Sequence, residues 1–83
     1  MFHKIDDIIL KDNLIIVVMF QNGITKSYDI KKILSKWEIF KELENNELYH
    51  MAKIDAGGLG ISWNENIDLS SEEIWENGIN IKL

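Results

Sequence analysis

The segment that most constrains the fold is Leu14–Phe20, where every residue is apolar. Its β-branched side chains are typical of a strand. A strand with one face in water alternates apolar and polar residues, so this segment predicts a strand that is covered on both faces. A helix would cover one face, and we expect a second helix or a second subunit to cover the other. The segment therefore favours a central strand and, with it, a homodimer.

Turn signals on both sides of this segment predict a three-stranded antiparallel meander. Asp12-Asn13 precedes it, and both residue types tolerate the left-handed backbone of a tight turn. Asn22-Gly23 follows it and is the strongest short hairpin signal. The flanking segments Ile5–Leu10 and Ile24–Tyr28 are then the outer strands.

The next segment predicts an amphipathic helix of about 14 residues, which begins after an N-cap at Asp29 and ends at Asn45-Asn46. Its apolar residues recur at spacings of three and four, which is the period of one helix face. We expect a kink near Lys36. The residues predicted to face the core are Ile30, Ile33, Leu34, Trp37, Phe40 and Leu43.

The C-terminal half predicts a hairpin, a short helix and an edge strand. The hairpin joins Leu48–Asp55 to Gly60–Asn64 through a glycine-rich turn. Ser70, with a glutamate three positions later, fits a capping box at the start of a helix that Gly78 would end. The alternating tail Ile79–Leu83 would add an edge strand.

These elements predict an α+β fold, in which an antiparallel β-meander plus hairpin packs on two helices in the order β-β-β-α-β-β-α. The length of 83 residues suits one domain, so residues 1–83 are predicted to be a single domain. The apolar run is far shorter than the roughly 18 residues that span a bilayer. The N-terminal residues Met1–Asp7 lack the layout of a signal peptide. We therefore expect a cytoplasmic protein without a membrane segment.

Five short motifs are spread over nearly the whole chain: Phe20–Gly23, Tyr28-Asp29, Gly60–Trp63, Ile67–Ser70 and Ile74-Trp75. Together they resemble the DUF2442 family of small bacterial proteins, most specifically from Gly60 to Trp75. Asn64 and Ser71 stand where the family often has proline, which bears on stability because proline mainly pre-sets φ. The resemblance implies an α+β fold and no known activity. Its members occur alone, fused to helix-turn-helix domains, or encoded beside another small protein in toxin–antitoxin-like arrangements.

Composition excludes several kinds of chemistry. The chain has no cysteine, which excludes thiolate metal sites and cysteine nucleophiles. It also has no arginine, which removes the guanidinium fork used on phosphates and guanines. Lysines 31, 32, 36 and 41 are interrupted by glutamates in a chain of net charge −5. We therefore expect no direct binding of nucleic acid, which favours a basic stripe.

No constellation of residues predicts a catalytic, cofactor or metal site. His3 and His50 are distant in the sequence and have no second ligand at metal-site spacing, so we expect partly exposed strand histidines. Glycines 57, 58 and 60 join two strands and not a strand to a helix, which excludes a phosphate loop. The adjacent acids Asp6-Asp7 and Glu72-Glu73 point apart, and no serine lies in a nucleophile motif. We predict that the chain is not an enzyme and binds no cofactor.

Acidic residues gather near the C-terminus, where the chain has five acids and no lysine between Asn64 and Asn80. One interpretation is helix stabilisation, because acids at a helix N-terminus interact favourably with the helix dipole. The other is a docking surface for a basic partner, bordered by two tryptophans that would serve as hot spots if exposed. This candidate interaction surface comprises Trp63, Glu65, Asp68, Glu72, Glu73, Trp75 and Glu76.

The sequence therefore predicts a non-catalytic domain that binds or regulates a protein partner. One alternative is an acidic phage-type inhibitor of a nucleic-acid-processing enzyme such as a CRISPR nuclease. A second alternative is a small-ligand-binding domain. For the second we expect a pocket lined by convergent polar groups near Tyr49, His50 or Trp63.

Overall fold

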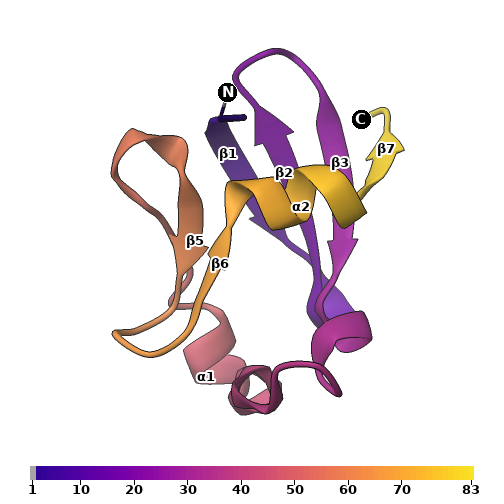
Figure 1. The fold of residues 1–83 in the computed structure, drawn as a ribbon. Helices are drawn as coiled ribbons and strands as arrows, with labels where there is room; N and C mark the ends of the chain where they lie inside the picture. The colour runs from indigo at the N-terminus through magenta and orange to yellow at the C-terminus, as the bar shows by residue number, and fades with distance from the viewer. Residues whose placement is uncertain (1) are drawn as a thin grey trace.

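The computed structural model describes residues 2–83, which form two antiparallel sheets and several short helices (Figure 1). This arrangement confirms the predicted α+β class. The larger sheet has the strand order β1-β2-β3-β7, and the smaller sheet has the order β4-β5-β6. The larger sheet comprises β1 Ile5–Leu10, β2 Ile15–Phe20, β3 Thr25–Asp29 and β7 Ile79–Ile81, and the smaller comprises β4 Lys53–Ile54, β5 Gly60–Ser62 and β6 Asp68–Ser70.

The first three strands form the predicted meander, with β2 at its centre. The predicted C-terminal edge strand is β7, which pairs antiparallel with β3. The β2–β3 turn follows its sequence signal, since Gly23 has a φ of 91° and the side chain of Asn22 accepts a hydrogen bond from the Ile24 N–H at 2.9 Å.

The β1–β2 connection differs from the predicted tight turn. Asp12–Leu14 forms a short 3-10 turn, η1, in which Asn13 and Leu14 have φ angles of 61° and 59°. Because Leu14 adopts this left-handed backbone, it lies outside the strand, and β2 begins at Ile15.

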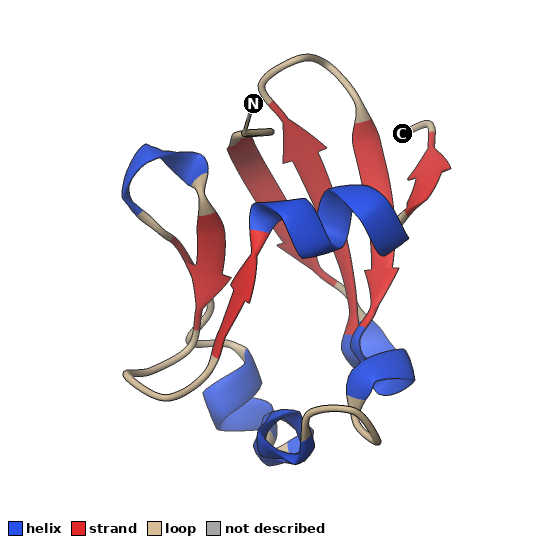
Figure 2. Ribbon diagram, viewed as in Figure 1, coloured by secondary structure: helices blue, strands red, loops and turns tan. Residues whose placement is uncertain are grey.

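The prediction of one α-helix after Asp29 is wrong, although the chain does break beside Lys36, where a kink was expected. The segment forms two 3-10 helices, η2 (Ile30–Ile33) and η3 (Glu38–Glu44), which lie with α1 (Asn46–Tyr49) at one end of the two sheets (Figure 2). The Asp29 N-cap is confirmed, since its carboxylate accepts the Lys31 N–H at 3.0 Å. Trp37 has the extended angles φ −131° and ψ 94°, which break the helix between the two turns.

The smaller sheet contains the predicted hairpin in shortened form. β4 has two residues and not the predicted eight, because the segment before it is helical. The side chain of Asn45 caps that helix, α1, by accepting the N–H groups of Glu47 and Leu48. The turn between β4 and β5 is η4 (Ala56–Gly58), and β6 is a strand that the sequence did not predict.

The helix α2 (Ser71–Asn77) crosses one face of the four-stranded sheet (Figure 1). Of its predicted capping box, the Ser70 N-cap is confirmed, because the Ser70 hydroxyl accepts the Glu73 N–H at 3.1 Å, whereas the Glu73 carboxylate binds Tyr28 and Asn77 instead of the Ser70 N–H. Gly78 follows the helix and donates its N–H to the Ile74 carbonyl at 2.8 Å. The core lies between α2, both sheets and the 3-10 helices, and its fully buried side chains include Ile16, Val18, Ile30, Leu43, Ile61, Ile67 and Ile74.

The opposite face of the four-stranded sheet carries no helix from residues 2–83 (Figure 1). On β2, Ile16, Val18 and Phe20 point into the core, so the alternate residues point to this opposite face. Of the two covers expected for the second face of β2, a helix of residues 2–83 is therefore excluded, and a second subunit stays a prediction. We call this surface the open sheet face, and its apolar members are Ile9, Ile15, Val17, Met19, Ile79 and Ile81.

Within the part of the chain that the structure describes, every helix is too short or too polar to cross a membrane.

Candidate functional site

The structure separates Trp63 from the rest of the candidate interaction surface. Trp63 is only 5% exposed. Its indole N–H donates to the Tyr49 carbonyl oxygen at 3.0 Å, and its ring packs edge-on against Phe40. The expectation that Trp63 borders a docking surface is therefore wrong, because the side chain ties α1 to the smaller sheet inside the core.

Trp75 lies on α2 in a cluster that the sequence did not predict. Its ring stacks on His3 with the ring centroids 3.8 Å apart and the planes 8° apart. The Lys26 ammonium lies 4.6 Å from the Trp75 ring centroid, and Phe20 meets the ring edge-on. Trp75 is half-buried and belongs to the partly buried side chains that pack against the core.

Glu72 joins the same cluster by binding the N-terminal segment. The backbone N–H of His3 donates to its carboxylate at 2.6 Å, and His3 Nδ1 lies 3.0 Å from the other carboxylate oxygen. The backbone hydrogen bond, followed by the ring contact, lowers the pKa of Glu72 below its usual range. His3 precedes β1 and is half-buried, whereas it was expected within a strand. No local signal could have found this pair, because 69 positions separate its members.

We predict that the contact between His3 and Glu72 makes stability depend on acid pH. A carboxylate whose pKa is lower in the folded chain stabilises the fold above its unfolded pKa, and this contribution is lost as the pH falls through the folded pKa. Between pH 7 and pH values below the ordinary pKa of 4.5, the free energy of unfolding should therefore fall more steeply in wild type than in Glu72→Gln. Urea denaturation over this range measures it, with Glu76→Gln as the control for lost charge. Parallel curves for wild type and Glu72→Gln would contradict the prediction.

Glu73 is also bound within the fold. Its carboxylate accepts hydrogen bonds from the Tyr28 hydroxyl and from the Asn77 amide, both at 2.9 Å. Burial, together with the Glu73 carboxylate, raises the pKa of Tyr28 well above its ordinary value. Glu72 and Glu73 thus support the interpretation that these acids stabilise α2 and its contacts.

The other three acids of the candidate surface are exposed. Glu65 lies in the loop between β5 and β6, Asp68 begins β6, and Glu76 lies on α2. Within residues 2–83, no hydrogen bond or ion pair reaches their side chains. These carboxylates remain available to a partner.

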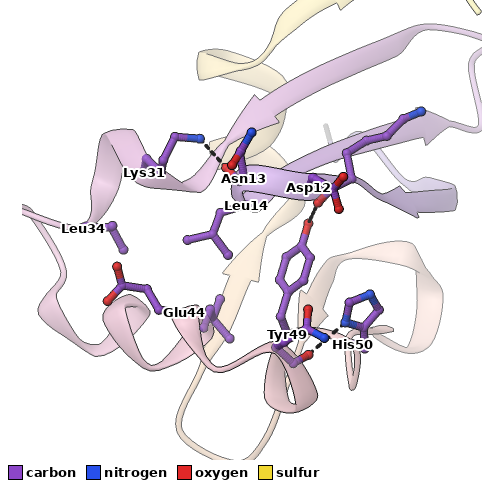
Figure 3. A pocket seen from close by; sticks show the side chains of 11 residues that line it. Asp12, Asn13, Leu14, Lys31, Leu34, Glu44, Tyr49 and His50 are labelled. Carbon is purple, nitrogen blue, oxygen red and sulfur yellow. Dashed lines mark hydrogen bonds between the residues drawn. The ribbon is translucent and has the colours of Figure 1, made fainter.

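A cavity of about 430 Å³ lies beside Tyr49 and His50, where the small-ligand alternative expects one (Figure 3). Trp63 does not line it. Its walls come from η1, η2, the end of η3 and α1, and include Asp12, Asn13, Lys31, Leu34, Glu44 and Asn46.

Three of the polar side chains that line this cavity, those of Tyr49, Lys31 and His50, already bond within the chain. The Tyr49 hydroxyl donates to the carbonyl oxygens of Lys11 and Ile15, at 2.8 and 3.0 Å. The Lys31 ammonium binds the Asn13 carbonyl oxygen and pairs with Asp29 at 2.9 Å. These bonds fasten η1 to α1 and η2, whereas no hydrogen bond or ion pair within residues 2–83 engages the side chains of Asp12, Glu44 and Asn46.

A second hollow, of about 540 Å³, lies between η3 and β6 and is here called the Trp37 groove. Trp37 is 38% exposed, so the expectation that it faces the core is wrong. The extended backbone at Trp37 takes the side chain out of the helical face that the spacing predicted. The Lys36 ammonium lies 4.3 Å from the ring centroid of Trp37. Its lining includes the side chains of Trp37, Ile39, Phe40, Asp68, Leu69 and Glu73.

The structure is a small α+β domain. Its Glu72 and Glu73 side chains bind within the fold, and apolar side chains are exposed on the open sheet face and at the Trp37 groove. A family model described as "Protein of unknown function (DUF2442)" matches residues 5–80. The chain belongs to this family, as its motifs indicated. Comparisons with curated proteins and with solved structures give no match.

Proposed function

We propose that this chain is a non-catalytic protein-interaction domain that binds a protein partner through the open sheet face. The observation that supports this is a set of apolar side chains from β1, β2 and β7 on one sheet face that no helix of residues 2–83 covers. Contiguous apolar surface of this kind marks interaction sites, because burying it removes apolar area from water.

The strand register shows which side chains lie next to one another across the open sheet face. Ile9 pairs with Val17, Val17 with Ser27, and Ser27 with Ile79, so one uncharged line of side chains crosses the whole sheet. Ile79 is 61% exposed and Ile9 is 39% exposed at the two ends of this line. A partner that covers this line is expected to be apolar there, since a charge facing it would be desolvated without a partner.

The alternatives have less support. In the cavity beside Tyr49 and His50, the Tyr49 hydroxyl and the Lys31 ammonium bind the chain itself and are not free for a small ligand. An inhibitor that mimics nucleic acid would need a broad acidic face, whereas two of the five C-terminal acids are bound within the fold. A toxin–antitoxin-like pairing, which the family resemblance implies, is one form that a protein interaction would take.

The test is capture of partners from an extract of the native host, with three forms of the full chain as bait. Wild type should retain a protein in stoichiometric amount, and Ile79→Glu should lose it, because the new charge would be buried in the interface at a cost of at least about a hundredfold in affinity. Asn80→Glu is the matched control: it adds the same charge one position along β7, on the other face and opposite Lys26.

Equal capture by all three forms, or no stoichiometric protein on any of them, would overturn the proposal. Sedimentation of the purified chain tests whether the molecule bound to the open sheet face is a second copy of this chain. A dimer that Ile79→Glu abolishes and Asn80→Glu retains supports a homodimer, and a monomer at high concentration excludes it.

A further inference from the structure

We infer that the Trp37 groove receives an arginine side chain from a segment of the protein partner, an inference that rests on the proposed interaction function. The alkyl part of the arginine would lie along the apolar wall, and its guanidinium would lie between the Trp37 ring and the carboxylates at the rim. The groove lies between η3 and β6, away from the open sheet face, so the two surfaces can be tested separately.

The apolar wall of the groove is exposed where a stem would contact it. Ile39 is 40% exposed beside Trp37, and both belong to the segment around the start of η3. Phe40 and Leu69 are buried and form the inner side. A hollow with two exposed apolar side chains suits the methylene stem of a long basic residue, which packs on apolar surface while its charged end reaches polar groups.

The charged rim selects a cation. Asp68 lies at the groove and forms no hydrogen bond or ion pair with residues 2–83. Glu73 also lines the groove, and its hydrogen bonds from Tyr28 and Asn77 both go to one carboxylate oxygen, Oε2. These oxygens provide acceptors for a donor group with several N–H bonds. The net charge of −5 adds a favourable long-range attraction to a basic segment.

A cation already lies over the Trp37 ring. The Lys36 ammonium is 4.3 Å from the ring centroid, within the distance of a cation–π contact. Lys36 does not line the groove, so this contact shows that the Trp37 ring accepts a cation over its face. A guanidinium is planar and more weakly hydrated than an ammonium, so it stacks better on an indole and pairs better with carboxylates. We therefore assign the occupant as arginine.

The experiment titrates the full chain with a synthetic peptide, glycine–serine–leucine–arginine–leucine–serine–glycine, and follows the three tryptophan indole N–H signals by NMR. The Trp37 signal should move, and the signal of Trp63, which is buried in the core, should not. The same peptide with citrulline in place of arginine keeps the shape and loses the charge. It should bind about tenfold more weakly.

Variants of the chain locate the contact. Asp68→Asn should weaken binding of the arginine peptide about fivefold, while Glu76→Gln removes the same charge from the exposed side of α2 and should leave binding unchanged. Lys36→Gln should strengthen binding, because it removes a positive charge that lies beside the Trp37 ring and repels the guanidinium. Equal binding of the arginine and citrulline peptides, or equal effects of Asp68→Asn and Glu76→Gln, would overturn the inference.

These outcomes can be separated from those of the proposed function. If Ile79→Glu abolishes capture of a host partner while the arginine peptide fails to move the Trp37 signal, the groove inference fails and the interaction function stands. If the peptide binds as expected while all three baits capture alike, the open sheet face is the wrong docking surface.

Discussion

Replacing Trp63 with alanine is expected to lower the free energy of unfolding by about 3–5 kcal/mol, the usual cost of deleting a buried tryptophan side chain. The ring is 5% exposed and packs against Phe40, and its indole N–H satisfies the Tyr49 carbonyl oxygen. The substitution would leave both a cavity and an unpaired carbonyl group. A domain of this size has a total stability of only several kcal/mol, so much of the variant population should be unfolded.

Trp37→Ala is the matched control, because it removes the same side chain from an exposed site. Its free energy of unfolding should stay within about 1 kcal/mol of wild type. Urea denaturation followed by far-ultraviolet circular dichroism compares the three forms. If Trp63→Ala proved as stable as wild type but lost partner binding, Trp63 would be an interaction residue after all.

Gly58→Ala is expected to be almost as damaging, at about 3 kcal/mol. Gly58 has a φ of 75°, a region that alanine adopts at a cost. A Cβ there would also lie 2.6 Å from the Ile5 carbonyl oxygen and 2.9 Å from the Ile5 nitrogen. These are backbone atoms of β1, so the clash can be relieved only by moving η4 away from the sheet.

The neighbouring Gly57 separates the cost of the left-handed backbone from the cost of the clash with β1. Gly57 has a similar φ of 77°, but a Cβ there would meet only the Leu59 side chain, at 3.8 Å. Gly57→Ala should therefore cost only about 1–2 kcal/mol, the price of the left-handed backbone. Equal losses for the two variants in thermal or urea unfolding would show that the close approach to β1 does not constrain the fold.

The parts of the fold that the sequence predicted well depend on neighbouring residues. The Asn22-Gly23 turn and the Ser70 cap act within three or four positions, so their side chains determine the local backbone directly. The Leu14–Phe20 run predicted a central strand for a similar reason, because the absence of polar residues excludes an ordinary half-exposed strand.

Predictions from the sequence were wrong where tertiary contacts determine the backbone conformation. Spacings of three and four residues predicted one helix, but the chain bends at Trp37 and reaches the core with two separate turns. The same error hid the Trp37 groove, because Trp37 was assigned to the core. His3 and Glu72 offered no signal either, since their contact forms only after α2 has packed on the sheet. The acids near the C-terminus were recognised, but only the structure separates those that are bound within the fold from those that are free.

The order of the elements along the chain has a consequence for synthesis on the ribosome. The meander is complete at Asp29, whereas the helix that covers its core face begins at Ser71, about forty residues later. At ordinary rates of translation this interval lasts roughly 2–8 s. During that time the nascent sheet has two apolar faces uncovered and an edge at β3 that β7 has not yet paired. The growing chain therefore passes through a stage that is vulnerable to aggregation, which folding chaperones or early binding of a partner would shorten.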